Sequence, residues 1–135
     1  MADVVKRVAI AVVEQRGRYL VGTRKPGEVF AGRAEFPGGK CQPDEDFAAC
    51  AVRECREETG LDVVGLRRVY TCRHTYAHAT LDLEFWLCRP ASLEGIGAVS
   101  GGFEWVPAQS LKALHFPDAN GPVIGLLAAG FESMS

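Results

Sequence analysis

Three glutamates, Glu54, Glu57 and Glu58, are the residues whose type and spacing suggest chemistry most directly. On a helix, residues at i, i+3 and i+4 are neighbours, so the three carboxylates should share one face. Each like-charged pair costs about 0.2–0.5 kcal/mol, and pairing of Arg53 with Glu57 offsets only part of that repulsion. A solvated acidic face would need no ligand. A divalent cation would remove the repulsion, because Mg²⁺ takes oxygen ligands and is commonly shared between carboxylates and phosphates.

A helix between Gly38-Gly39 and Thr59-Gly60 must position these glutamates. We expect Asp44 to be its N-cap, followed by further negative charge in the first turn, where the helix dipole favours it. Gly60 suits the left-handed residue that commonly ends a helix. The two glycines are expected to form a turn whose backbone can approach a ligand or metal closely. Small and apolar residues repeat at helical spacing on a second face, which should be buried: Ala48, Ala51, Val52, Cys55 and Thr59.

The whole stretch follows the pattern G-x5-E-x7-R-E-U-x-E-E-x-G-U, in which U is an apolar residue. The matching residues are Gly39, Glu45, Arg53, Glu54, Cys55, Glu57, Glu58, Gly60 and Leu61. This pattern is the Nudix box, and a complete match is far more specific than most short motifs. The chain therefore resembles the Nudix hydrolase family. The resemblance implies an α/β fold with a mixed β-sheet sandwiched between helices. It also implies hydrolysis of nucleoside diphosphates linked to another moiety, with Mg²⁺ or Mn²⁺ as cofactor.

The resemblance also assigns roles to single residues. It implies a metal-ligand set made of Glu54, Glu57, Glu58, Glu104 and the backbone carbonyl of Gly38. Arg53 would orient Glu57, and Lys40 would hold the loop or a phosphate. Either Glu54 or Glu104, a glutamate that lies outside the box, would accept a proton from the attacking water. The catalytic set is thus Arg53, Glu54, Glu57 and Glu104.

Two further stretches resemble the MutT-type subfamily, whose members hydrolyse 8-oxo-dGTP. Residues 116–124 fit the pattern F-P-x-A-N-x-P-V-I, and Arg24 lies at the matching distance before Glu35. The resemblance runs from about Val8 to Leu127, although Val29 stands where that subfamily has a histidine. It implies an arginine contact to phosphate, backbone and asparagine contacts to the nucleotide, and an aromatic wall for the base. The predicted substrate-binding residues are Arg24, Glu35, Phe36, Pro37, Gly38, Lys40, Phe85 and Asn120.

Length, charge and cysteine content limit the remaining possibilities. A chain of 135 residues is expected to form a single domain over residues 1–135. A net charge of −2 argues against a nucleic-acid polymer as partner. The sequence shows no apolar run long enough for a membrane span and no signal-peptide pattern at its start. The five cysteines contain no C-x-x-C pair, so we expect them to be reduced in a cytoplasmic protein. We expect the protein to be a monomer or a weak dimer. His74, His78 and His115 fit no ligand pattern.

Hydrophobic periodicity and turn residues predict the other elements. Strands are expected at residues 4–13, 19–23, 61–64, 69–76, 79–88 and 104–106, with a short extended segment at 35–37. A short helix is expected at 109–114, and Pro122 should begin the last helix. The resulting order is β-β-β-α-β-β-β-α, which is a mixed α/β arrangement.

These features predict a Mg²⁺-dependent pyrophosphohydrolase that converts a nucleoside triphosphate to a monophosphate and pyrophosphate, with 8-oxo-dGTP or 8-oxo-GTP preferred. One alternative keeps the chemistry but acts on pyrimidine triphosphates or on many nucleotides. Another is a regulatory module that binds a nucleotide without hydrolysing it. The intact carboxylate set argues against that module, because binding alone would not require Glu54, Glu57 and Glu58.

Overall fold

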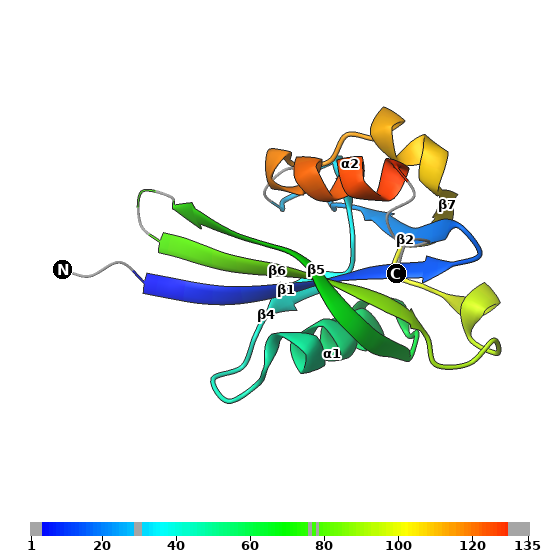
Figure 1. The fold of residues 1–135 in the computed structure, drawn as a ribbon, viewed down its shortest axis with the longest axis horizontal. Coiled ribbons are helices and arrows are strands. Elements are labelled where there is room, and N and C mark those ends of the chain that lie inside the picture. The colour runs from blue at the N-terminus through cyan, green and yellow to red at the C-terminus, as the bar shows by residue number, and fades with distance from the viewer. Residues whose placement is uncertain (1–3, 29–30, 76, 78, 130–135) are drawn as a thin grey trace.

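The computed structural model describes residues 4–28, 31–75, 77 and 79–129. In this part of the chain a mixed sheet lies between two α-helices on opposite faces (Figure 1), as the sequence predicts. The strands are β1 (Val4–Gln15), β2 (Arg18–Thr23), β3 (Ala34–Glu35), β4 (Gly38–Lys40), β5 (Val63–Thr75), β6 (Ala79–Pro90) and β7 (Glu104–Pro107). The helices are α1 (Phe47–Thr59), α2 (Gly121–Ala128) and the short 3₁₀ helices η1 (Ile96–Ala98), η2 (Ala108–Ala113) and η3 (Asp118–Asn120).

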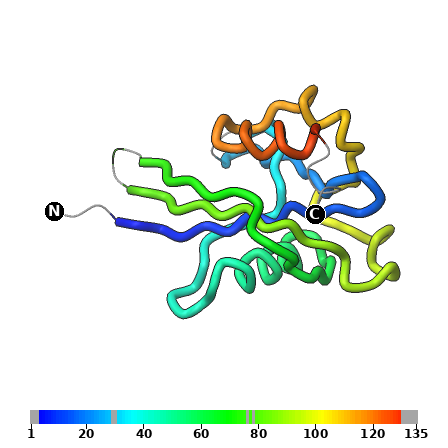
Figure 2. The backbone as a smooth tube through the Cα atoms, in the orientation of Figure 1, coloured from blue at the N-terminus to red at the C-terminus, as the bar shows by residue number. Residues whose placement is uncertain are grey.

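Strand β1 lies at the centre of the sheet and organises it. It runs parallel to β6 over the whole length from the Val4–Ala79 pair to the Val13–Cys88 pair. On its other side it pairs antiparallel with β4, and its end continues into the hairpin with β2. The order across the sheet is β3-β2-β1-β6-β5, and β7 pairs with β2. Figure 2 shows the start of β1 and the β5–β6 hairpin extending beyond both helices.

The two faces of β1 contribute to two different hydrophobic clusters, because successive side chains alternate across a strand. Ala9 and Ala11, both completely buried, face α1 and belong to a cluster with Cys50, Ala51 and other residues. Val12 faces the opposite cluster, which includes residues of α2. Since alanine presents only a methyl group, α1 can lie close to the sheet at this point.

Helix α1 begins two residues later than the sequence suggested. Its N-cap is Asp46, whose carboxylate accepts a hydrogen bond from the backbone N–H of Ala49 at 2.7 Å. The predicted N-cap, Asp44, is therefore wrong. Glu45 instead closes the preceding turn, since its carboxylate accepts a bond from the Gln42 N–H at 3.0 Å. At the other end Gly60 adopts the expected left-handed conformation, with φ of 79°.

Three other predictions differ from the structure. The expected turn at Gly38-Gly39 is the strand β4, because Gly39 pairs with Ala9 of β1. The two strands expected at 61–64 and 69–76 form the single strand β5, in which register shifts between Gly65 and Arg67 and again between Arg68 and Tyr70 interrupt the alternation. The predicted helix at 109–114 is the 3₁₀ helix η2. Within the described residues, neither α-helix is long and apolar enough to cross a membrane.

Replacing Asp46 by alanine should lower the free energy of unfolding by about 1 kcal/mol, because an N-terminal N–H of α1 loses its acceptor. The matched control is Asp44→Ala, which removes an exposed carboxylate of the same type two residues earlier and should leave stability nearly unchanged. Urea denaturation of both variants measures the difference. A larger loss in the Asp44 variant would restore the sequence-based N-cap.

Candidate active site

A cleft of about 630 Å³ opens on the face of the sheet that α2 covers, at the place where β4 lies against Glu58 of α1. Its apolar wall consists of Val8 and Ile10 from β1 and of Leu81 and Leu83 from the parallel neighbour β6. The other lining residues are mostly polar, charged or glycine: Arg24, Glu28, Glu35, Phe36, Gly38, Gly39, Lys40, Glu58, Pro117 and Asn120. A flat apolar wall beside a charged rim suits a ligand that has an apolar part and a charged part.

Strand β4 places a backbone donor against Glu58 of α1. The carbonyl of Pro37 and the N–H of Cys41 both bond to β1 at 2.8 Å, on either side of Gly38. Since residues alternate in an antiparallel ladder, Gly38 turns its own N–H and carbonyl away from β1. Its N–H donates to the Glu58 carboxylate at 2.9 Å. The Gly38 carbonyl therefore points to the same side of β4 as this carboxylate.

Neither glycine of β4 has room for a side chain. A Cβ on Gly38 would lie 2.6 Å from the backbone oxygen of Ala9. A Cβ on Gly39 would lie 2.5 Å from Cδ of Glu54, so the carboxyl group occupies the space that a side chain would need. The absence of a Cβ on Gly39 thus makes room for Glu54 against β4, and the absence of a Cβ on Gly38 lets β4 lie close to β1.

Burial makes these carboxylates costly to ionise. Burial raises the pKa of Glu58 to about 7, although the Gly38 N–H partly opposes this shift. Burial also raises the pKa of Glu54, while the nearby Arg53 lowers it. A cation between them would favour the ionised forms. Two carboxylates and the carbonyl of Gly38 form a set of hard oxygen donors, which fits Mg²⁺ or Mn²⁺.

Arg53 binds the third carboxylate of the box, Glu57, and its Nη1 also lies 3.7 Å from Oε1 of Glu54. Its guanidinium donates to Glu45 at 2.7 and 2.8 Å, to Glu57 at 3.0 Å and to the Lys40 carbonyl at 3.1 Å. Hydrogen bonding to Glu45 and Glu57 raises the pKa of Arg53, and the same interaction lowers the pKa of Glu45 to about 2. Glu57 is 57% exposed on this side. Among the described residues, the three carboxylates of the box do not converge on one point.

Six of the predicted substrate-binding residues line the cleft: Arg24, Glu35, Phe36, Gly38, Lys40 and Asn120. Arg24 and Glu35 form an ion pair at 3.0 Å, while burial raises the pKa of Glu35. The Phe36 ring packs on Phe116, with ring centroids 4.9 Å apart. The Asn120 side-chain amide donates to the Pro117 carbonyl at 3.1 Å, which fixes its orientation.

Six predicted site residues do not line the cleft: Arg53, Glu54 and Glu57, which lie on α1, and Pro37, Phe85 and Glu104. Phe85 is completely buried and packs near the Tyr70 ring, with centroids 6.1 Å apart, because it lies deeper on the face of β6 that presents Leu81 and Leu83. Pro37 is also fully buried, and its carbonyl bonds to β1. Glu104 is exposed at the start of β7. Val29 and His78 lie outside the described residues.

The apolar wall of the cleft and the lining residues Glu28 and Pro117 were not predicted from the sequence. The wall could have been found, because Val8 and Ile10 alternate with small residues along β1 and so must share a face. Glu28 comes from a loop that no pattern covers, and Pro117, although part of the matched segment 116–124, was given no contact of its own. Their position depends on tertiary packing.

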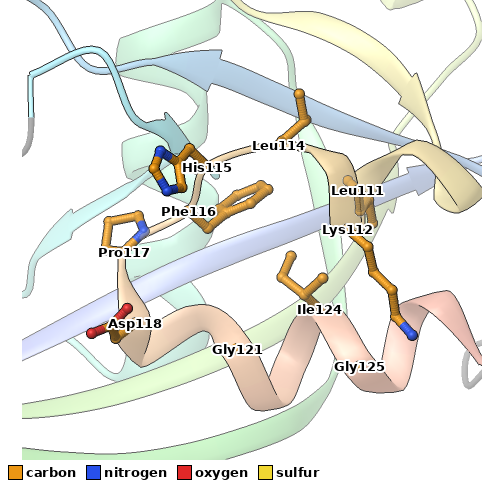
Figure 3. Close-up of a pocket in the computed structure, with 10 residues that line it drawn as sticks. All are labelled: Leu111, Lys112, Leu114, His115, Phe116, Pro117, Asp118, Gly121, Ile124 and Gly125. Carbon is orange, nitrogen blue, oxygen red and sulfur yellow. The ribbon is translucent and has the colours of Figure 1, made fainter.

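A second, shallower pocket of about 470 Å³ lies next to the cleft and shares Pro117 with it (Figure 3). Its walls come from η2, the following loop and α2, and Figure 3 shows Phe116 pointing toward Ile124. Its charged lining residues are Lys112, His115 and Asp118, and no residue of α1 reaches it. The carboxylate chemistry therefore belongs to the cleft.

The raised pKa of Glu58 predicts a pH-dependent stability in the metal-free protein. Between its ordinary value of 4.5 and about 7, the folded chain holds a proton that the unfolded chain has lost, so unfolding free energy falls as pH rises. Glu58→Gln should therefore stabilise the chelator-treated protein at about pH 8 by about 1–2 kcal/mol after allowance for solvent screening. The gain should shrink as pH falls from about 7 and vanish well below 4.5, where both states are protonated. Urea denaturation across this range measures it, and a gain independent of pH would contradict the assignment.

Comparison with known proteins agrees with this geometry. The 8-oxo-dGTP diphosphatase of Escherichia coli (strain K12) is 29% identical over 122 residues, covering 90% of this chain and 95% of that protein. The CTP pyrophosphohydrolase of the same organism is 33% identical over 79 residues, 58% of each chain. The crystal structure of the MutT protein from Methanosarcina mazei Go1 shares the fold, with a TM-score of 0.77 at 18% identity over 96% of this chain and 97% of that one.

The family model described as a NUDIX domain matches residues 8–126, which include the box, strand β4 and the whole cleft. The match spans nearly all of the described chain, and the carboxylates of the box line the junction with β4, so the protein belongs to the Nudix hydrolase family.

Proposed function

We propose that this Nudix hydrolase is a Mg²⁺-dependent nucleoside triphosphate pyrophosphohydrolase that prefers 8-oxo-dGTP or its ribonucleotide form. Water attacks a phosphoanhydride bond, and the products are a nucleoside monophosphate and pyrophosphate. The observation that carries the proposal is the single cleft that joins the box carboxylate Glu58 to an apolar wall and to Asn120. Glu58 would act at the phosphates, and the apolar wall and Asn120 would hold the base.

The phosphate end contains the groups that such a reaction requires. Glu54, Glu58 and the Gly38 carbonyl would hold the metal, which supplies positive charge to the phosphate oxygens and to the attacking water. Arg24 and Lys40 line the same cleft and would bind phosphate oxygens. Glu54 would accept the proton of the attacking water, for which its raised pKa is suited.

Arg53 and Glu45 support this arrangement without lining the cleft. Because their two hydrogen bonds fix the guanidinium, Arg53 can hold Glu57 at the rim of the metal site. We assign Arg53 a positioning role, and we keep Glu57 as a ligand that the bound metal would draw in. Glu104, which is exposed and outside the lining of the cleft, is a weaker candidate for the proton acceptor.

The base end contains one residue suited to recognise an oxidised guanine. Guanine presents two acceptors, N7 and O6, on one edge, whereas 8-oxoguanine carries a hydrogen on N7 and presents a donor beside an acceptor. An asparagine amide offers an acceptor beside a donor. The amide of Asn120 is oriented by Pro117 and uses one of its two hydrogens there, which leaves its oxygen and second hydrogen for a base.

A second candidate keeps the chemistry and changes the base. The partial similarity to a CTP pyrophosphohydrolase favours pyrimidine triphosphates or a broad range of nucleotides as substrates. Hydrolysis rates measured across normal and damaged nucleotides separate the two candidates. A module that only binds nucleotides remains disfavoured, because it would not require buried carboxylates with raised pKa values.

Substituting a carboxylate of the box should remove most activity while the protein stays folded. Glu57→Gln and Glu58→Gln delete a charge and keep the side-chain shape, so kcat should fall by about 10–100-fold or more. Glu94→Gln, a change to an exposed glutamate in the loop before η1, is the matched control and should retain wild-type turnover. Pyrophosphate release at saturating Mg²⁺ measures the effect. Near wild-type rates in both box variants would refute the metal assignment.

Substituting Asn120 should decide the substrate. Asn120→Ala should reduce the preference for 8-oxo-dGTP over dGTP by about 10-fold or more, because lost or unpaired polar contacts cost about 1–3 kcal/mol. Turnover of dGTP should change less. The measurement is the ratio of kcat/KM for the two nucleotides, with Asp118→Ala in the same 3₁₀ turn as the control.

The wild-type ratio is itself informative. A ratio near one would end the 8-oxoguanine hypothesis and favour the broad-range candidate. A high ratio that survives in the Asn120 variant would keep the substrate but remove Asn120 as the residue that reads the base.

A further inference from the structure

A second group of metal-ligand side chains lies beside Arg53, which bonds to one of its members, Glu45. Cys41, Glu45 and Cys50 each offer one ligand atom, and these three atoms lie within 4.8 Å of one another. Among the described residues, this is the one group of three histidine, cysteine or acidic side chains that gathers so closely. None of the three lines the cleft.

The backbone fixes each member of this group. Cys41 follows β4, where its N–H donates to β1 at 2.8 Å. Cys50 is completely buried in α1, and its thiol donates to the Gly39 carbonyl at 3.5 Å. Glu45 is held by the turn that begins at Gln42. Figure 1 shows β4 lying beside α1, which is how residues from two elements meet here.

The chemistry of these ligands differs from that of the cleft. Two sulfurs and one carboxylate favour a thiophilic cation such as Zn²⁺ over Mg²⁺. Three protein ligands leave the fourth tetrahedral position open to water. Burial raises the pKa of the Cys50 thiol to about 12, so a cation that binds weakly to thiolates does not displace its proton.

We propose that Cys41, Glu45 and Cys50 bind a thiophilic divalent cation of the Zn²⁺ type, and that its binding inhibits hydrolysis. The inhibitory part rests on the proposed function, whereas the binding part does not. Nothing in the assigned roles of the Nudix box requires either cysteine as a ligand.

Inhibition follows from the position of Arg53. Glu45 accepts the two shortest hydrogen bonds of this guanidinium, at 2.7 and 2.8 Å. A cation that takes a Glu45 oxygen competes with those bonds. The same guanidinium holds Glu57 and the carbonyl of Lys40, so both lose a fixed partner when Arg53 is released.

The binding test uses Co²⁺ as a spectroscopic probe on the intact protein, with saturating Mg²⁺ and a non-thiol reductant that keeps the cysteines reduced. We expect thiolate-to-Co²⁺ charge-transfer absorption that Zn²⁺ abolishes by displacement. Cys41→Ser should lose this absorption, and because Cys41 is only half-buried, the variant should fold. Cys72→Ser changes another half-buried cysteine and should keep the absorption. No absorption in the wild type, or undiminished absorption in Cys41→Ser, would overturn the site.

The activity test titrates Zn²⁺ into the reaction at saturating Mg²⁺. Low micromolar Zn²⁺ should inhibit hydrolysis by the wild type and by Cys72→Ser. Inhibition of Cys41→Ser should need Zn²⁺ concentrations at least about 10-fold higher, because this variant lacks one of the metal ligands. Equal inhibition of all three proteins would place Zn²⁺ at the catalytic carboxylates and refute the coupling. If none hydrolyses any nucleotide, the proposed function fails, while the absorption test still decides the metal site.

Discussion

The contact between α1 and the two glycines of β4 determines the geometry of this protein's active site. Ala9 and Ala11 let the helix approach the sheet, the missing Cβ of Gly39 leaves room for Glu54, and the Gly38 N–H holds Glu58. The contact has a cost, since burial raises the pKa of Glu58 to about 7. A site that holds acidic groups in an environment unfavourable to their charge is suited to a cation and to substrate phosphates.

Arg53 connects this contact to its surroundings. It bonds to Glu45 before the helix, to Glu57 on the helix and to the Lys40 carbonyl after β4. One side chain therefore holds the start of α1, the rim of the metal site and the strand that carries the glycines. A metal ion that binds Glu45 should weaken its hydrogen bonds to Arg53 and so change how Arg53 holds Glu57. This is the basis of the proposed coupling between a metal ion at Cys41, Glu45 and Cys50 and hydrolysis in the active site.

The sequence predicted those features that local periodicity and a specific motif encode. Helical spacing predicted the buried residues Ala51, Cys55 and Thr59 of α1, and Gly60 marked the end of the helix. Arg24, Glu35 and Asn120, which the motif matches assigned to substrate binding, line one cleft although they come from three different segments.

Other features depended on tertiary structure. Asp44 and Asp46 were both chemically suitable N-caps, and the turn closed by Glu45 decided between them. The resemblance assigned Phe85 to the base pocket, whereas its depth depends on the packing of the cluster that it shares with α2. Glycines rarely favour strands, so β4 could not be foreseen without its partner β1. The proximity of Cys41 and Cys50 likewise depends on how β4 packs beside α1.

The binding of Mn²⁺ to Gly39→Ala, followed by electron paramagnetic resonance, tests the central claim most directly. A Cβ at this position meets the flexible end of Glu54, so the variant should fold while its Glu54 carboxylate is displaced. Gly125→Ala, where a Cβ meets nothing within 4 Å, is the control. We predict that Gly39→Ala weakens Mn²⁺ binding by about 10-fold or more and that the control binds as the wild type does. Wild-type affinity in a folded Gly39→Ala protein would contradict the claim that the α1–β4 contact builds the metal site.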